Sequence, residues 1–220
     1  MELKGKIIDF LGDSITEGHS VEDIPNNRYD NVLKRLCGLQ AVYNYGIGGT
    51  RIAHQYKPSE KARWDLNFCG RAYDLYPDAD IIVVYGGVND YYHGDAPFGE
   101  IGDKTRETFC GSVDFLLSFL HETYPKAKVV FMTPAHCLND GKPSASLHKH
   151  VPGYPLIKYV RAIEEIAALH GVPVLNLFEK LPIDPNDPDD CQTYTAEGLH
   201  FNDAGHRIIA ETLKTFLEEL

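Results

Sequence analysis

Short apolar runs alternate along the chain with longer segments in which apolar residues recur every three or four positions. The apolar runs, which are candidate strands, are residues 6–11, 41–46, 80–85, 128–133 and 173–177. Each is five or six residues long and almost wholly apolar, a pattern typical of strands that are buried on both faces of a parallel sheet. The alternation therefore predicts an α/β fold with a five-stranded parallel sheet covered on both faces.

The intervening segments carry the periodicity of amphipathic helices. Apolar residues follow a three–four spacing in 109–120, in 156–167 and in 209–220, which predicts a helix in each place. The last helix should begin near Asn202 or Asp203, because either side chain can cap it. Weaker patterns predict helices over 26–38 and 59–75, and the stretches expected as loops are 91–104, 134–154 and 182–195.

The composition is that of one globular domain. The chain has 220 residues, of which 43% are hydrophobic and 24% charged, and it shows no repeat or linker, so we expect a single domain over residues 1–220. The formal net charge of −11 argues against nucleic acid as a partner, because phosphate binding needs clustered Lys and Arg. It also disfavours docking on anionic membranes. The sequence leaves open whether the chain forms a homo-oligomer.

The cysteines and the N-terminus bear on location. Five cysteines are scattered along the chain without a Cys-x-x-Cys pair, which indicates reduced thiols rather than a disulfide framework or a zinc site. The first six residues lead into a strand and do not resemble a signal peptide, and no window approaches the roughly 18 apolar residues of a membrane span. We therefore expect a cytoplasmic protein, although a mature secreted form would look the same.

Clusters of glycine and polar residues follow the predicted strands. Gly12-Asp13-Ser14 comes after the first strand, 44-NYGIGGT-50 ends the second, and 86-GGVND-90 follows the third. A fourth cluster, 194-YTAEGLHFNDAGH-206, precedes the last helix. Because functional groups gather at the carboxyl ends of the strands in an open parallel sheet, we expect these clusters to meet.

Together the clusters supply the parts of an acyl-transfer site. Ser14 can act as a nucleophile if His200 takes its proton, and Glu197, three residues before His200, can fix the tautomer of the imidazole and stabilise the imidazolium. The backbone N–H groups of Ser14 and Gly49 and the side-chain amide of Asn89 can bind the oxyanion. Glycine at 49 would allow the backbone to approach the substrate closely.

Each cluster alone also has an ordinary structural explanation. Asp13 reads best as a turn residue that bonds its own backbone, Asn89 can sit in a turn, and His200 can pack or cap beside the last helix. A dinucleotide loop is excluded at 46–51, because the Gly-x-Gly-x-x-Gly pattern would need glycine where Arg51 stands. The four clusters in this order are far harder to explain separately.

The same residues resemble the SGNH hydrolases, also called GDSL-type esterases. Gly12-Asp13-Ser14-Ile15 is similar to the first block of that family with its serine nucleophile, 44-NYGIGG-49 to the second, and Gly87-Val88-Asn89-Asp90 to the third. Glu197-Gly198-Leu199-His200 stands where the family has Asp-x-x-His. The resemblance implies a flavodoxin-like, three-layer α/β/α sandwich that hydrolyses carboxylic esters without a metal or cofactor.

One position departs from the family pattern. The acid is Glu197 where the family usually has Asp, and the extra methylene leaves three alternatives. Glu197 completes the triad, which we prefer; a backbone carbonyl orients His200 and Glu197 is auxiliary; or Asp203 or an acid of the 184–190 loop takes the role.

The loops must choose the substrate, because the fold does not. Tyr91, Tyr92 and His93 follow the Asn89 block, His54 follows the Gly49 block, and His136 lies in the 134–154 loop. These side chains can stack on a sugar or a flat acyl group, or they can simply pack the loops. His148-Lys149-His150 offers no acid or cysteine at ligand spacing, so we expect no metal site there.

The chain lacks the long apolar lid of an interfacial lipase. We therefore expect a small-molecule ester as substrate, with an acetyl-sized acyl group on a carbohydrate or small metabolite. The alternatives are a thioesterase or lysophospholipase acting on longer acyl chains, a non-catalytic binding module on the same fold, and a flavodoxin-like nucleotide binder. The last is disfavoured because Asp13 would repel a phosphate and residues 9–18 contain no basic side chain.

Overall fold

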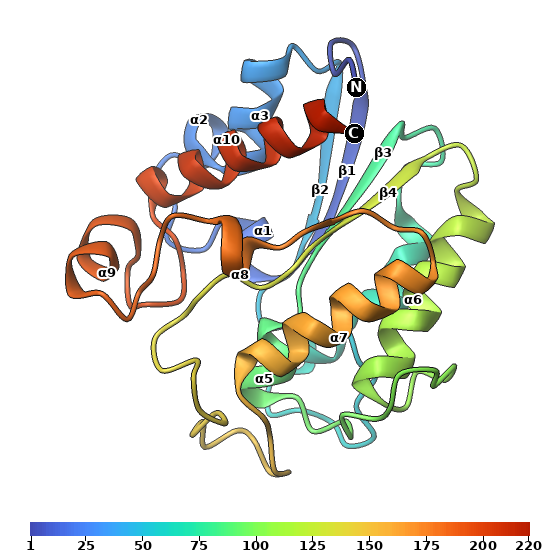
Figure 1. Cartoon of the computed structure of the whole chain (residues 1–220), viewed down its shortest axis with the longest axis vertical. Helices are drawn as coiled ribbons and strands as arrows, with labels where there is room; N and C mark the ends of the chain where they lie inside the picture. The colour runs from blue at the N-terminus through green and yellow to red at the C-terminus, as the bar shows by residue number, and fades with distance from the viewer.

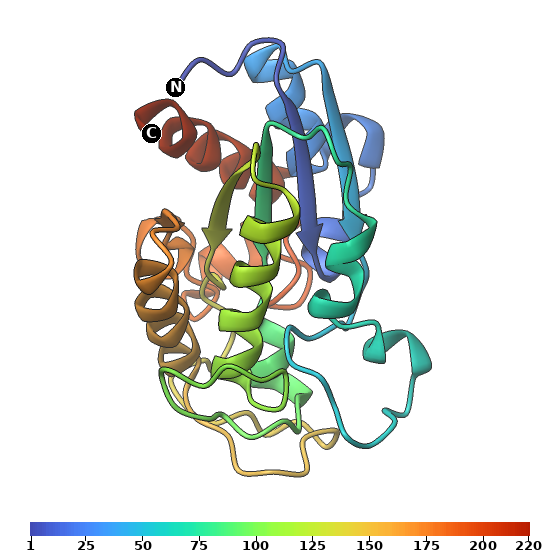
Figure 2. The ribbon, with the colours of Figure 1, turned by 90° about the vertical axis from the view of Figure 1, so that its right-hand side faces the viewer.

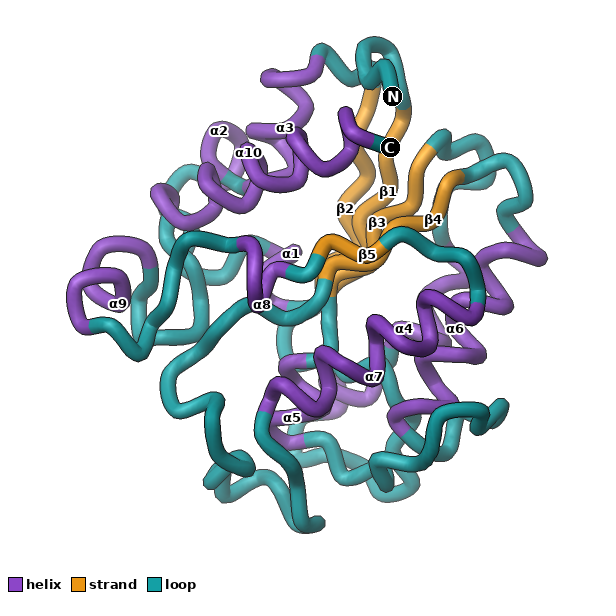
Figure 3. Tube along the Cα trace, in the orientation of Figure 1, coloured by secondary structure: helices purple, strands orange, loops and turns teal.

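The computed structural model describes residues 1–220 and contains one parallel sheet at its centre (Figure 3). Its strands are β1 (Ile7–Gly12), β2 (Ala41–Gly46), β3 (Ile81–Tyr85), β4 (Lys128–Met132) and β5 (Val174–Leu175). They pair in the order β2-β1-β3-β4-β5, and every pairing is parallel. The five predicted strands are confirmed, although β5 is shorter than expected.

Two hydrophobic cores lie on opposite faces of this sheet. On one face, Phe10 and Val83 pack with residues of α3 (Tyr29–Cys37) and α10 (Asp203–Glu219). On the other, Leu11 and Val84 pack with residues of α6 (Phe109–Thr123) and α7 (Leu156–Leu169). Figure 1 shows the sheet between these two helix pairs. The inner strands β1, β3 and β4 are almost wholly buried, which explains their nearly continuous apolar sequences, whereas the edge strand β2 is only partly buried. The expected three-layer α/β/α sandwich is confirmed.

The carboxyl ends of the strands all point toward one end of the molecule. In Figure 2 the arrows of β1 and β4 run downward, away from the two chain termini. The termini lie together at the opposite end, where the amino group of Met1 donates a hydrogen bond of 2.6 Å to the carbonyl of Glu218. The polar clusters that follow the strands are thereby collected at the end remote from the termini.

The helices with strong periodicity form where predicted. Residues 109–120 and 156–167 lie within α6 and α7, and Asn202 caps α10 by accepting hydrogen bonds from the N–H groups of Ala204 and Gly205. The pattern over 26–38 is divided into α2 (Ile24–Asn27) and α3, because Arg28 between them has an extended backbone.

Three expectations about local structure are wrong. Residues 59–75 form no continuous helix but three short turns, η1 (Ala62–Asp65), α4 (Phe68–Arg71) and η2 (Ala72–Asp74). The expected loop at 91–104 begins inside α5 (Val88–His93), and the loop at 182–195 contains α9 (Pro188–Tyr194). The two remaining helices are α1 (Ser14–Glu17) and α8 (Leu177–Lys180). No helix has the length and apolar character needed to cross a membrane.

Candidate active site

Ser14 stands where β1 passes into the single turn of α1. The side chain of Asp13 caps this turn by accepting a hydrogen bond from the N–H of Ile15, at 3.0 Å, as a turn residue would. The turn lies close against the end of β2, since a Cβ on Gly46 would come within 2.2 Å of the backbone nitrogen of Glu17. Ser14 is thus held just beyond the carboxyl end of β1, with 8% of its surface exposed.

His200 and Glu197 are presented by a tight turn before α10. An isolated antiparallel bridge joins Thr195 to Phe201, and Gly198 takes a positive φ of 82° between them, a conformation that glycine adopts without strain. The hydroxyl of Thr195 accepts a hydrogen bond from the N–H of Gly198, at 2.9 Å. This turn points the side chains of Glu197 and His200 the same way.

The structure brings Ser14, His200 and Glu197 into one hydrogen-bonded row. Nε2 of His200 lies 2.8 Å from the hydroxyl of Ser14, and Nδ1 contacts the carboxylate of Glu197. Partial burial raises the pKa of Glu197, but the hydrogen bond and charge interaction with His200 outweigh it, so the pKa lies below its usual value. An ionised Glu197 accepts the Nδ1–H, which leaves the lone pair of Nε2 free for the proton of Ser14.

Three other acids that could take this role, Asp203, Asp187 and Asp184, are bonded elsewhere. The carboxylate of Asp203 accepts hydrogen bonds from the N–H of Glu22 and the amide of Asn27, at 2.9 and 2.7 Å. Asp187 caps α9, and Asp184 accepts from Asn186. None of them has a hydrogen bond to His200, whereas Glu197 also accepts the backbone N–H of His200, at 3.2 Å.

The loop after β2 lies beside the serine. A Cβ on Gly48 would be 3.4 Å from the Cβ of Ser14, and the N–H of Gly48 donates to the carboxylate of Glu17 at 2.9 Å. Gly49 has a φ of 79°, and a Cβ there would overlap the indole of Trp64 at 2.1 Å. Only glycine therefore fits at 49, both for its backbone conformation and for the close approach of Trp64.

Asn89 lies in the first turn of α5, after Gly87 has turned the chain out of β3. One N–H of its side-chain amide donates to the carbonyl of Thr50 at 3.1 Å. The next residue, Asp90, is buried and accepts hydrogen bonds from the N–H groups of Ile52 and Ala53, at 2.9 and 3.0 Å. Burial raises the pKa of Asp90 to about 6, although these two hydrogen bonds lower it. Together these contacts tie the 50–53 segment to α5.

Sequence reasoning missed two buried arginines that join the clusters. Arg71 donates hydrogen bonds to the carbonyl of Gly12 at 3.0 Å and to the hydroxyl of Thr50 at 2.9 Å, so it links the ends of β1 and β2. Arg51 is 2% exposed and contacts His93. A charged residue among glycines at a strand end was the available signal for Arg51; nothing in the sequence singles out Arg71.

The five predicted substrate contacts are placed very differently. Tyr91 is buried, and its hydroxyl donates to the carbonyls of Asn139 and Lys142. Tyr92 is partly exposed, and His93 is buried against Trp64. His54 is exposed beside Tyr56, and His136 pairs with Asp140 at 2.7 Å.

Two open cavities are lined by some of these predicted contacts, and one of the two also includes Glu197 in its lining. One, of about 460 Å³, is bordered by Trp64 and His93, by residues 55–60, and by His148, His150 and Val151. The other, of about 450 Å³, is bordered by Tyr91, Tyr92, Glu197 and residues 138–139 and 142–146. Tyr91, Tyr92 and His93 therefore border space that a ligand can occupy, whereas His54 borders neither cavity.

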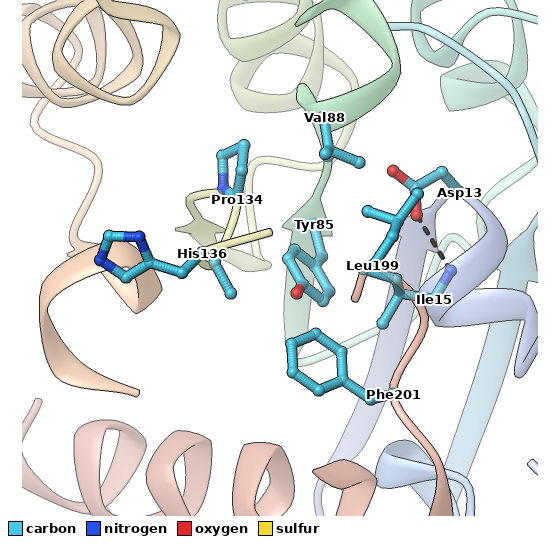
Figure 4. A pocket seen from close by; sticks show the side chains of 10 residues that line it. Asp13, Ile15, Tyr85, Val88, Pro134, His136, Leu199 and Phe201 are labelled. Carbon is cyan, nitrogen blue, oxygen red and sulfur yellow. Dashed lines mark hydrogen bonds between the residues drawn. The ribbon is translucent and has the colours of Figure 1, made fainter. Parts of the chain in front are cut away.

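A much smaller buried cavity, of about 10 Å³, lies beneath the serine turn (Figure 4). Asp13, Tyr85 and Phe201 line it, and the imidazole of His136 lies at the opposite side from Asp13. It is too small for a substrate.

Across the chain, no group of three or more His, Cys, Asp or Glu side chains is arranged to hold a metal ion. In the His148-Lys149-His150 segment, the imidazole of His148 pairs with the carboxylate of Glu60 at 2.9 Å.

Comparison with known proteins places the chain in a family. The sequence model of the GDSL-like lipase/acylhydrolase family matches residues 10–208. A crystal structure of a protein from Lactobacillus plantarum is 32% identical, with a TM-score of 0.82 over 98% of each chain. A search of curated proteins found no match.

Two more distant structures share the fold. The native aryl esterase of M. smegmatis is 18% identical, with a TM-score of 0.72, and the alignment covers 98% of this chain and 99% of that one. An acetyl xylan esterase is 19% identical, with a TM-score of 0.65 over 96% of this chain and 99% of that one. The chain belongs to the GDSL-like lipase/acylhydrolase family and is a carboxylic ester hydrolase of the GDSL type.

Proposed function

We propose that the chain is a serine esterase that removes small acyl groups, acetyl above all, from carbohydrate or small-metabolite esters. The observation that carries the proposal is the row Ser14–His200–Glu197, with 2.8 Å between the hydroxyl and Nε2. Residues 1–220 act as one catalytic domain. The five cysteines are free thiols, which supports the cytoplasm as its location.

The reaction follows from the order of these groups. His200 takes the proton of Ser14 as Oγ attacks the carbonyl carbon, and the resulting oxyanion accepts hydrogen bonds from the N–H groups of Ser14 and Gly49 and from the amide of Asn89. Glu197 stabilises the imidazolium. The tetrahedral intermediate collapses, and the departing alcohol takes the proton from His200. Water, activated by the same imidazole, then hydrolyses the acyl-enzyme.

The composition of the two open cavities supports a polar alcohol and a short acyl group. Three of the fourteen residues around the 460 Å³ cavity are hydrophobic, as are four of the ten around the 450 Å³ cavity. A long acyl chain binds best against continuous apolar walls, and neither cavity has them. The acetyl xylan esterase of the same fold agrees with this substrate class.

Chain-length preference tests the proposal. We expect kcat/KM on p-nitrophenyl esters to fall by about tenfold or more from acetate to octanoate, because a polar cavity gains nothing from extra methylenes. The Ser14→Ala variant is the control and should have lost this activity. A preference for octanoate would favour a thioesterase or lysophospholipase, and a folded wild type inactive on every ester would favour a binding module.

A further inference from the structure

A chain of hydrogen bonds leads from Arg51 through His93 to Asn89, away from the three residues of the catalytic row. Nη1 of Arg51 lies 3.0 Å from Nδ1 of His93, and Nε2 of His93 lies 3.2 Å from Oδ1 of Asn89. All three side chains are buried. Asn89 is the side-chain donor of the oxyanion hole proposed above, so the chain ends on a group that meets the substrate.

The chemistry of these groups fixes the direction of every bond. A guanidinium has donors only, so Nδ1 of His93 must accept from Arg51 and carries no proton. The single proton of the neutral ring is then on Nε2, which donates to Asn89. An acceptor must face it, and this places Oδ1 of Asn89 toward His93 and the amide nitrogen toward the other side.

The opposite side of the amide agrees with this orientation. One N–H of Asn89 donates to the carbonyl of Thr50 at 3.1 Å, which leaves one N–H unused by the protein. Burial, and after it the charge of Arg51, lowers the pKa of His93 to about 3. His93 therefore stays neutral and keeps one tautomer throughout the pH range in which an esterase works.

Arg51 is itself held firmly. Its Nη2 donates to the hydroxyl of Ser59 at 2.6 Å and to the carboxylate of Asp65 at 2.7 Å. The indole of Trp64 packs on the ring of His93 in a tilted arrangement, with 4.3 Å between ring centroids, and it lies against Gly49. The 59–65 segment thus braces both the Arg51–His93 pair and the backbone donor of the oxyanion hole.

We infer that His93, oriented by Arg51, is a positioning residue that turns the free N–H of Asn89 toward the substrate oxyanion. This rests on the proposed function and deepens it. The sequence suggested His93 as a substrate contact; its hydrogen bonds favour this second role. Misplacing one oxyanion donor weakens its bond in the transition state, so kcat should fall more than KM changes.

The test compares four variants on p-nitrophenyl acetate. His93→Phe keeps a ring beside Trp64 and loses both hydrogen bonds, so we expect kcat about 10- to 100-fold lower, with KM within about twofold. His93→Gln can still accept from Arg51 and donate to Asn89, and it should recover a large part of this loss. The control His170→Phe removes a histidine paired with Asp114 far from Asn89 and should leave kcat unchanged. Arg51→Lys keeps the charge but loses the planar guanidinium that donates to His93, Ser59 and Asp65 together, and we expect kcat about fivefold lower or more.

A double-mutant cycle separates positioning from loss of structure. Because His93 acts through Asn89, adding His93→Phe to Asn89→Ala should lower kcat by less than about twofold further. An equal loss in both backgrounds, or full activity in His93→Phe, would overturn the inference. Should His93→Phe not fold, full activity of Arg51→Lys would overturn it. The proposed function fails separately, if Ser14→Ala remains as active as the wild type.

Discussion

At the scale of single residues, the turn that carries Glu197 accommodates a glutamate at the position where the family usually has an aspartate. Glu197 and His200 are three residues apart, and Gly198 between them has a positive φ, so the longer side chain folds back onto Nδ1 and onto the backbone N–H of His200. Half of the Glu197 side chain is exposed. Solvent therefore screens part of its interaction with the imidazolium.

Glu197→Gln should lower kcat on p-nitrophenyl acetate by about 10- to 1,000-fold and leave the fold intact. The amide keeps the shape of the side chain but loses the charge that stabilises the imidazolium and fixes the tautomer. Steady-state kinetics and a melting curve measure the two effects. Glu179→Gln, which breaks a surface pair with Arg161, is the matched control. An unchanged kcat in Glu197→Gln would remove Glu197 from the triad.

At the scale of secondary-structure elements, the sequence predicted the strands and helices that have a regular apolar periodicity. It did not predict the elements whose conformation is set by contacts with residues distant in the sequence. The strands and helices α6, α7 and α10 bury continuous apolar faces, and such faces are visible as periodicity. Residues 59–75 have a helical pattern but are held as short turns, because Ser59 and Asp65 accept hydrogen bonds from Arg51. Trp64, between them, lies against Gly49. Tertiary contacts override local preference there.

Helix α9 was missed for a different reason. The stretch 182–195 is rich in proline and aspartate, which favours a loop, yet Asp187-Pro188 is also a helix start. Asp187 accepts hydrogen bonds from the N–H groups of Asp189 and Asp190, and Pro188 occupies the first turn, where its missing N–H costs nothing. Local capping chemistry therefore outweighed composition.

At the scale of the whole molecule, the parallel sheet gathers groups separated by as many as 186 positions in sequence, as for Ser14 and His200. The carboxyl-end rule was enough to predict that the four clusters would meet. The rule could not predict the buried hydrogen bonds of Arg51, Arg71 and His93 that support these clusters, because those bonds depend on how side chains from separate elements pack.

The same sheet buries a carboxyl group that makes stability depend on pH. Asp9 in β1 is wholly buried; one of its oxygens accepts the N–H of Tyr76 at 2.6 Å, and the other has no partner. Burial raises the pKa of Asp9 to about 7, although the Tyr76 hydrogen bond lowers it. In the unfolded chain this group ionises near pH 4, so between about pH 4 and 7 the unfolded state loses a proton that the folded state retains. Stability therefore falls as the pH rises through this window.

Asp9→Asn removes this titration. We expect the free energy of unfolding of the variant, relative to that of the wild type, to be about 2–3 kcal/mol higher (the variant relatively more stable) at pH 8 than at pH 5. Urea unfolding of both proteins at the two pH values measures it. Asp80→Asn is the control: the pKa of Asp80 is lowered by Lys6 and the N–H of Ile7 despite some burial, so its difference from the wild type should not change between pH 5 and 8. An equally constant difference for Asp9→Asn would contradict the expectation.

The proposed nucleophile, Ser14, can be tested by trapping it. A p-nitrophenyl phosphonate transfers its phosphonyl group to a serine whose hydroxyl is activated by a neighbouring base, and peptide mass spectrometry locates the adduct. The account predicts one adduct per chain, on Ser14, with loss of esterase activity in step with labelling and much slower labelling in His200→Ala. A folded, ester-cleaving wild type that carries no adduct on Ser14 would contradict it.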